Sequence, residues 1–103
     1  MSDIPVYMVV NLTINDAGPY SKYEKGFFGM LKKYGGSFLT YDDSAETFEG
    51  VSPPAGRVII FSFPSEQAAK DWYVDADYQA LSEHRRAGTT IEFLTMVRGM
   101  PAR

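Results

Sequence analysis

Apolar and polar residues follow two different periods along the chain, and the changes of period divide it into strands and helices. Runs rich in valine, isoleucine and aromatic residues, typical of strands, occur at 5–12, 37–41, 57–63 and 91–97. The segments 19–34 and 65–88 between them carry apolar residues at spacings of three and four, as amphipathic helices do. The pattern predicts an α+β chain with the order β-α-β-β-α-β, the split βαβ arrangement.

The second helical segment and the middle of the chain contain further breaks. Asp75 or Asp77 is expected to begin a second helical piece, which Gly88 ends. Residues 46–50 are expected to continue the second strand after a bend, and 51–56 form a loop with two prolines. Because no linker or low-complexity tract interrupts the series, residues 1–103 are predicted to form a single domain.

Both faces of the predicted four-stranded antiparallel sheet carry apolar side chains. Successive strand residues point to opposite faces. Ile59, Phe61 and Phe63 therefore oppose Val58 and Ile60, and Leu94 and Met96 oppose Ile91, Phe93 and Val97. Both helices lie on one face of this arrangement, so the other face needs a different cover. The pattern predicts a homodimer with two-fold symmetry, in which two sheets stack.

Composition excludes several function classes. The 103 residues carry a net charge of −3, which disfavours nonspecific nucleic-acid binding and docking on anionic membranes. There is no cysteine, so disulfides, thiolate catalysis and cysteine-ligated zinc are excluded. His84 is the single histidine, which excludes a multi-histidine metal site within one chain. We expect no bound metal and no cofactor.

The expected location is the cytoplasm. The first ten residues, MSDIPVYMVV, have no basic region ahead of their apolar stretch, unlike a signal peptide. No uninterrupted apolar run approaches the ~20 residues of a membrane span.

Several short runs together resemble a known family. They are YGG at 34–36, EGV at 49–51, RVIIFSFPS at 57–65, AAKDWY at 68–73 and DYQAL at 77–81. Their order and spacing are similar to domain-of-unknown-function family 1330 over roughly residues 5–99. The resemblance implies a ferredoxin-like fold that pairs into a dimeric α/β barrel. It also implies kinship with a superfamily of cofactor-less monooxygenases, haem-degrading enzymes and small-molecule isomerases.

Two positions depart from that family. Tyr34 stands where members often have histidine, and Ser62 stands where they often have glutamate. These departures weaken any acid–base role at the two positions.

Aromatic residues supply the first candidate site. Tyr20, Tyr23 and Phe27 of the first helical segment face Trp72, Tyr73 and Tyr78 of the second if both pack on the sheet. The same spacing is typical of core residues. Because several tyrosine hydroxyls need partners, we favour a partly open cleft, with Tyr73 and Tyr78 as pocket residues and Trp72 core at its base.

Polar residues supply further candidates. Asn11 lies within an apolar strand and needs a hydrogen-bond partner if buried. Arg57 and Arg85 match family positions, and an arginine at a cleft can hold a carboxylate through two hydrogen bonds. The alternative is a salt bridge to Glu46, Glu49 or Glu92, or plain solvation. Haem-degrading members of the superfamily are similar in the placement of Asn11, Trp72 and His84, although His84 has no supporting ligand.

The predicted function is the binding of a small aromatic or carboxylated metabolite between sheet and helices, with cofactor-less oxidation or isomerisation as the chemistry if the chain is an enzyme. Tyr23, Trp72, Tyr73 and Tyr78 would form its walls, and Asn11 and Arg85 would orient polar atoms of the ligand. The alternatives are a non-catalytic dimerisation module and a haem-binding or haem-degrading protein.

Overall fold

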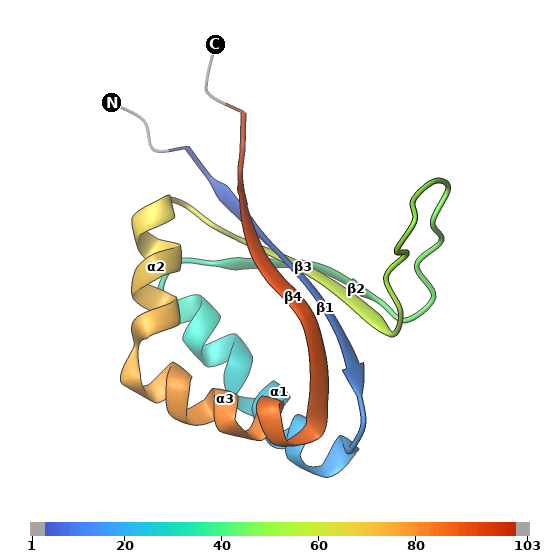
Figure 1. Ribbon diagram of the computed structural model, residues 1–103. Helices are drawn as coiled ribbons and strands as arrows, with labels where there is room; N and C mark the ends of the chain where they lie inside the picture. The colour runs from blue at the N-terminus through green and yellow to red at the C-terminus, as the bar shows by residue number, and fades with distance from the viewer. Residues whose placement is uncertain (1–3, 101–103) are drawn as a thin grey trace.

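The computed structural model describes residues 4–100 (Figure 1). Its elements are β1 (Val6–Ile14), α1 (Ala17–Lys33), β2 (Ser37–Asp42), β3 (Arg57–Phe63), α2 (Glu66–Val74), α3 (Ala76–Gly88) and β4 (Thr89–Arg98). The predicted order is confirmed, with the second helical segment divided at Asp75 into α2 and α3. The expected strand at 46–50 is wrong: these residues lie in an exposed loop, because β3 begins only at Arg57 and leaves them no strand to pair with.

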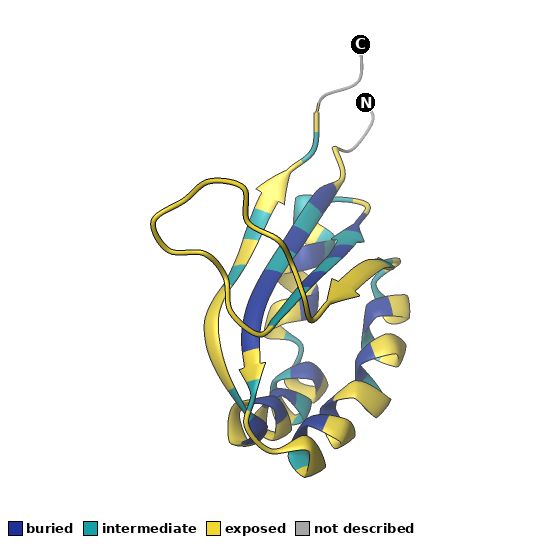
Figure 2. Cartoon of the chain, turned by 90° about the vertical axis from the view of Figure 1, so that its right-hand side faces the viewer, coloured by how far each residue is buried: buried dark blue, intermediate teal, exposed yellow. Residues whose placement is uncertain are grey.

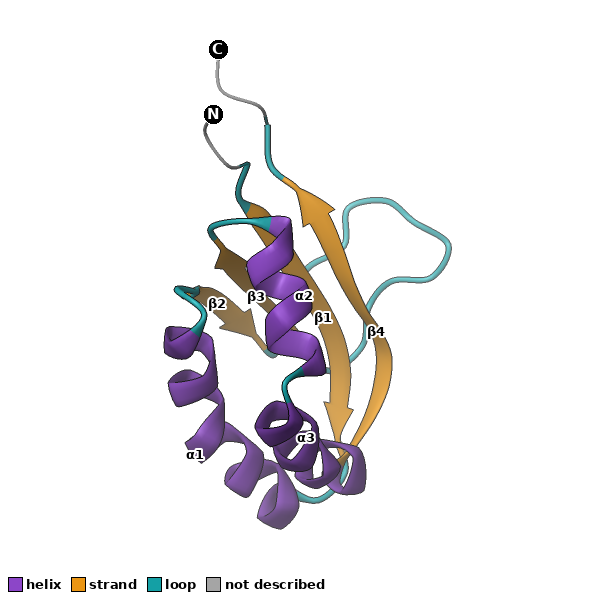
Figure 3. Ribbon diagram, turned by 90° about the vertical axis from the view of Figure 1, so that its left-hand side faces the viewer, coloured by secondary structure: helices purple, strands orange, loops and turns teal. Residues whose placement is uncertain are grey.

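The four strands form one antiparallel sheet in the order β2-β3-β1-β4. All three helices lie on one face of it, as Figure 3 shows. This is the ferredoxin-like arrangement that the sequence predicts. The loop 43–56 projects away from the sheet on the side opposite the helices (Figure 1).

The core lies between the helices and the sheet. Alternate residues of β1 and β3 are buried on this side, namely Val6, Met8, Val10, Leu12, Ile59, Phe61 and Phe63. They meet the buried stripe of α1, formed by Tyr20, Tyr23, Phe27 and Leu31. Figure 2 shows this burial as dark blue bands on the strands and helices. The apolar residues that alternate along the strands therefore pack, in one layer, against the apolar residues that recur at helical spacing along α1.

No helix covers the outer face of the sheet in the described part of the chain, although the end of the 43–56 loop lies against it at Asn11. Pairing places Val9 opposite Ile60 and Thr95, and Tyr7 opposite Val97. Phe93 pairs with Asn11, and the side chains of Phe93 and Val97 remain 41% and 45% exposed. Alternation fails at two places. A bulge between Asn11 and Leu12 pairs Ile91 with Leu12, whose side chain is buried in the core, and the register of β2 against β3 shifts between Phe38 and Thr40.

The end of α3 is fastened to the start of α1. The backbone N–H groups of Asn15 and Asp16 donate to the Gly88 carbonyl at 2.8 and 3.0 Å. A β-carbon at Gly88 would lie 2.6 Å from the Asp16 carbonyl oxygen, so only glycine allows this approach. The contact fixes the inner face of α3 beside α1, where the candidate site is found.

None of the helices between residues 4 and 100 combines the length and the apolar character needed to cross a membrane.

Candidate functional site

A cavity of about 170 Å³ lies between α1, α3 and the sheet. Most of its walls are apolar or aromatic, including Val10, Phe27, Phe28, Tyr41 and Ile59. The side chains of Glu24, Arg57 and Arg85 are its charged members. An apolar enclosure with a few polar groups is typical of small-molecule sites.

Arg85 is placed in this cavity by the inner face of α3. Only 4% of the residue is exposed, and its guanidinium carbon lies 5.8 Å from the centre of the Tyr23 ring. Within residues 4–100 no carboxylate forms an ion pair with Arg85, and its buried Nε has no hydrogen-bond partner. Because an unpaired buried charge is costly, this guanidinium is a strong site for an anionic group.

Arg57 also reaches the cavity, but its charge is already neutralised. Its Nε and Nη2 donate to the carboxylate of Asp43 at 2.7 and 3.0 Å, and its Nη1 donates to Glu24 at 3.4 Å. The bond to Asp43 raises the pKa of Arg57 and lowers the pKa of Asp43. Arg57 is therefore ion-paired, but its partners are Asp43 and Glu24 and not the acids that the sequence suggested.

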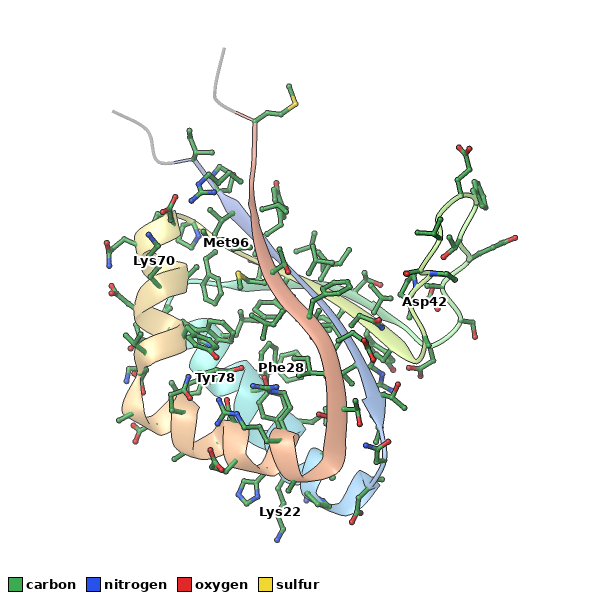
Figure 4. All side chains as sticks on the ribbon, in the orientation of Figure 1. Lys22, Phe28, Asp42, Lys70, Tyr78 and Met96 are labelled. Atoms are coloured by element: carbon green, nitrogen blue, oxygen red, sulfur yellow. The ribbon has the colours of Figure 1, made fainter. Side chains whose placement is uncertain are left out.

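Tyr23 lines the cavity, and its hydroxyl group contacts that of Tyr78 in the core. The two hydroxyl oxygens lie 2.8 Å apart. Burial, followed by the neighbouring Tyr78 hydroxyl, raises the pKa of Tyr23 well above its ordinary value, so the phenol stays neutral. Tyr78 is completely buried, and Figure 4 shows its side chain between α3 and the sheet.

Trp72 belongs to the core behind this pair. Its ring is completely buried and packs against Tyr78, Phe61 and Phe63 at centroid distances of 4.2, 5.4 and 5.2 Å. Its indole N–H has no partner among the described residues. Neither Trp72 nor Tyr78 lines the cavity directly.

Tyr73 and Asn11 lie elsewhere. Tyr73 is 40% exposed and borders a shallow groove between α2 and β4, beside Met8 and Met96. Asn11 is 1% exposed, and its Nδ2 donates to the carbonyl oxygens of Ala55 and Arg57 at 2.7 and 3.1 Å. The buried amide has the partners that its burial required, and it fastens the end of the 43–56 loop to β1.

The structure thus brings Tyr23 and Arg85 to one cavity, with Tyr78 and Trp72 behind it. Sequence reasoning missed Glu24, Tyr41 and Phe28. Alternation would have placed Tyr41 on the face opposite to Phe38. The register shift between Phe38 and Thr40 brings Tyr41 to the helix face, where it pairs with Ile59, and no sequence signal marks that shift. Nothing in the sequence marks Glu24, whose position depends on how α1 lies against β3.

His84 is exposed on α3, and the cavity is not lined by Asn11, Trp72 or His84. The residues that haem binding would require therefore do not meet there. Among residues 4–100, no three His, Asp or Glu side chains are grouped as metal ligands would be.

Comparison with known proteins agrees with this fold. The model of a domain of unknown function, DUF1330, matches residues 5–100, so the chain belongs to this family. No curated protein matches the sequence at a significant level.

Solved structures with the same fold include proteins of known and of unknown activity. A protein of unknown function from Rhodopseudomonas palustris is 18% identical, with a TM-score of 0.74, over 98% of this chain and 85% of that one. SnoaB, a cofactor-independent oxygenase from Streptomyces nogalater, is 15% identical, with a TM-score of 0.60 and 96% of each chain covered. A dabb family protein with a ferredoxin-like fold from Mesorhizobium loti is 16% identical, with a TM-score of 0.56. The match covers 98% of this chain and 100% of that one.

Proposed function

We propose that this member of the DUF1330 family binds a small aromatic carboxylate in the cavity beneath α1. The observation that carries the proposal is the Arg85 guanidinium, which is buried, lines an otherwise largely apolar cavity and forms no ion pair with any carboxylate of residues 4–100. A ligand carboxylate would supply the missing charge through two parallel hydrogen bonds.

The size of the cavity limits the ligand to about one ring. An apolar cavity of ~150 Å³ in another protein holds benzene, and the volume here is about 170 Å³. The aromatic walls from Tyr23, Phe27 and Phe61 offer ring faces and edges to a flat molecule. A haem would exceed this volume several-fold, so the haem-binding alternative gains no support from the cavity.

For chemistry, we propose cofactor-independent oxidation or isomerisation of that ligand. The shared fold with SnoaB supports this choice at the level of architecture only. The apolar walls would exclude water, and the Arg85 cation would stabilise negative charge developing on a ligand oxygen. Tyr23, held neutral by burial and paired with the Tyr78 hydroxyl, would form part of the wall and would not act as a base.

We also propose that a second copy of the chain covers the outer face of the sheet. The residues paired across this face are uncharged, apart from Asp42 at the end of β2. Four strands of up to ten residues present a face of roughly 600 Å², near the ~800 Å² per partner of a stable interface. The face is largely uncharged and includes Tyr7, Val9, Ile60, Phe93 and Val97. These properties support a partner with the same face, which a two-fold axis provides.

The ligand proposal is tested with benzoate and its neutral isostere benzamide. Isothermal titration is expected to show that wild-type protein prefers benzoate by about tenfold or more. Arg85→Gln should reduce that preference to near one. Arg86→Gln removes the adjacent arginine, which is exposed and paired with Glu83, and should leave the preference intact. A preference that survives Arg85→Gln, or no binding of benzoate, would contradict the proposal.

A further inference from the structure

We infer that Glu24 forms a second polar end of the site and selects one-ring carboxylates that carry a hydroxyl or amino group opposite the carboxylate. The inference rests on the proposed function, because it takes the carboxylate to lie at Arg85. It starts from the position of Glu24, whose side chain lines the cavity and is half exposed, at 50%.

Glu24 and Arg85 approach the cavity from different sides of α1. Tyr23, next to Arg85, turns toward α3, where its hydroxyl meets that of Tyr78. Phe28 is one turn from Glu24 and turns toward β2, where its ring lies 5.3 Å from that of Phe38. The cation is therefore on the α3 side of the cavity and the anion on the β2 side.

The Glu24 carboxylate has hydrogen-bonding capacity to spare. Within residues 4–100 it receives one hydrogen bond, from Nη1 of Arg57, and the distance of 3.4 Å exceeds the usual 2.7–3.2 Å. Arg57 directs its shorter bonds to Asp43. An ionised carboxylate accepts several hydrogen bonds, so Glu24 remains free to accept one from a ligand.

The charges of the three polar side chains define the ligand. Arg57 makes its two shorter bonds to Asp43. Among the cavity-lining residues, this leaves Arg85 as a cation without an acid and Glu24 as an acid with one long contact to Arg57. A dianionic ligand would place its second charge against Glu24. A ligand with a carboxylate at one end and a hydrogen-bond donor at the other would satisfy both.

The test compares benzoate with 4-hydroxybenzoate by isothermal titration. Wild-type protein is expected to bind 4-hydroxybenzoate about tenfold more tightly, since hydrogen bonds to charged groups are worth that much or more. Glu24→Gln should reduce the advantage several-fold, and Glu24→Ala should remove it. Glu83→Gln removes an exposed acid of α3 that lies outside the cavity lining, and it should keep the full advantage.

The outcomes separate the two proposals. If benzoate binds through Arg85 but the hydroxyl adds nothing, or if its advantage survives both Glu24 variants, the Glu24 inference is overturned and the proposed function stands. If neither acid binds to wild-type protein, both are overturned. An advantage that is lost only in the Glu24 variants supports the inference.

Discussion

The hydroxyl oxygens of Tyr23 and Tyr78 lie 2.8 Å apart in the interior, joining α1 to α3 behind the cavity. Tyr78 is completely buried and Tyr23 is 6% exposed, so water has little access to either group. Each hydroxyl is therefore the main partner of the other. The pair holds the Tyr23 ring in place, and the Arg85 guanidinium lies 5.8 Å from the centre of that ring.

Removing either hydroxyl should leave the other without a partner. We expect Tyr78→Phe and Tyr23→Phe each to lower the free energy of unfolding by about 1 kcal/mol. The double variant should lose less than the sum of the two, because no buried hydroxyl is then stranded. Urea unfolding of the four proteins measures the coupling. Strictly additive losses would show that the two hydroxyls do not depend on each other.

We expect Arg85 to lower the free energy of unfolding of the protein. Its guanidinium is buried, and no carboxylate among residues 4–100 pairs with it. Arg85→Met, which keeps the length and removes the charge, should therefore raise the free energy of unfolding by about 1 kcal/mol. The same variant should lose benzoate binding. Gain of stability with loss of binding is the signature of a residue retained for function.

Arg86→Met is the matched control for this prediction. Arg86 is adjacent, more exposed and paired with Glu83 at 2.6 Å, so its replacement should change stability by no more than about 0.5 kcal/mol. A clear destabilisation by Arg85→Met would instead identify Arg85 as a structural residue.

The architecture could be predicted from sequence because the pattern of apolar residues within each segment indicates whether it is a strand or a helix. The alternation of β3 and the stripe of α1 both depend on burial on one side, and the structure keeps both. Residues 46–50, expected to continue the second strand, are the exception: β3 starts at Arg57 and gives them no pairing edge. The bulge that redirects Ile91 likewise depends on the register of two strands.

The site was less predictable, because it depends on which charges find partners in space. Arg57 and Arg85 both match family positions, yet Asp43 pairs with the first, and no acid among the described residues pairs with the second. The sequence indicates that a buried Asn11 needs a hydrogen-bond partner. Only the path of the 43–56 loop determines that this partner is the backbone of Ala55 and Arg57. Local patterns predict burial and do not predict these pairings.

Asp75 should make stability sensitive to acid. Hydrogen bonds from the Tyr34 hydroxyl and Lys33 hold its pKa well below the ordinary 3.8, and its other oxygen caps α3 by accepting from the N–H groups of Asp77 and Tyr78. The folded-state pKa is lower than the unfolded one. The stabilisation is therefore complete above about pH 4 and is lost progressively below it.

Asp75→Asn keeps a capping oxygen but removes the charge. We expect the variant to be less stable than wild type at pH 7, with the difference shrinking as the pH falls below 4. Urea unfolding at pH 7, 4 and 3 measures this. Glu66, whose pKa Arg98 and Lys70 lower to about 2, contributes equally to both proteins and cancels in the difference. A difference that is constant with pH would exclude an electrostatic role for Asp75.

The outer face of the sheet supplies the last prediction. Val9 lies in the middle of that face, paired with Ile60 and Thr95. If a second copy covers the face, native mass spectrometry should show two chains for wild-type protein and one for Val9→Lys, because the lysine charge would be buried at the contact. Val97→Lys, on the same face and 45% exposed in the single chain, should have the same effect with less risk to folding.

Val74→Lys is the matched control, since Val74 is 73% exposed on α2, away from the sheet face. It should leave the dimer intact, and its circular dichroism should match that of the two sheet variants. If wild type is a single chain, the outer face is solvated and the dimer proposal fails. If all three variants dissociate equally, the contact lies elsewhere. Dissociation confined to Val9→Lys and Val97→Lys would locate the partner on the face that the helices leave uncovered.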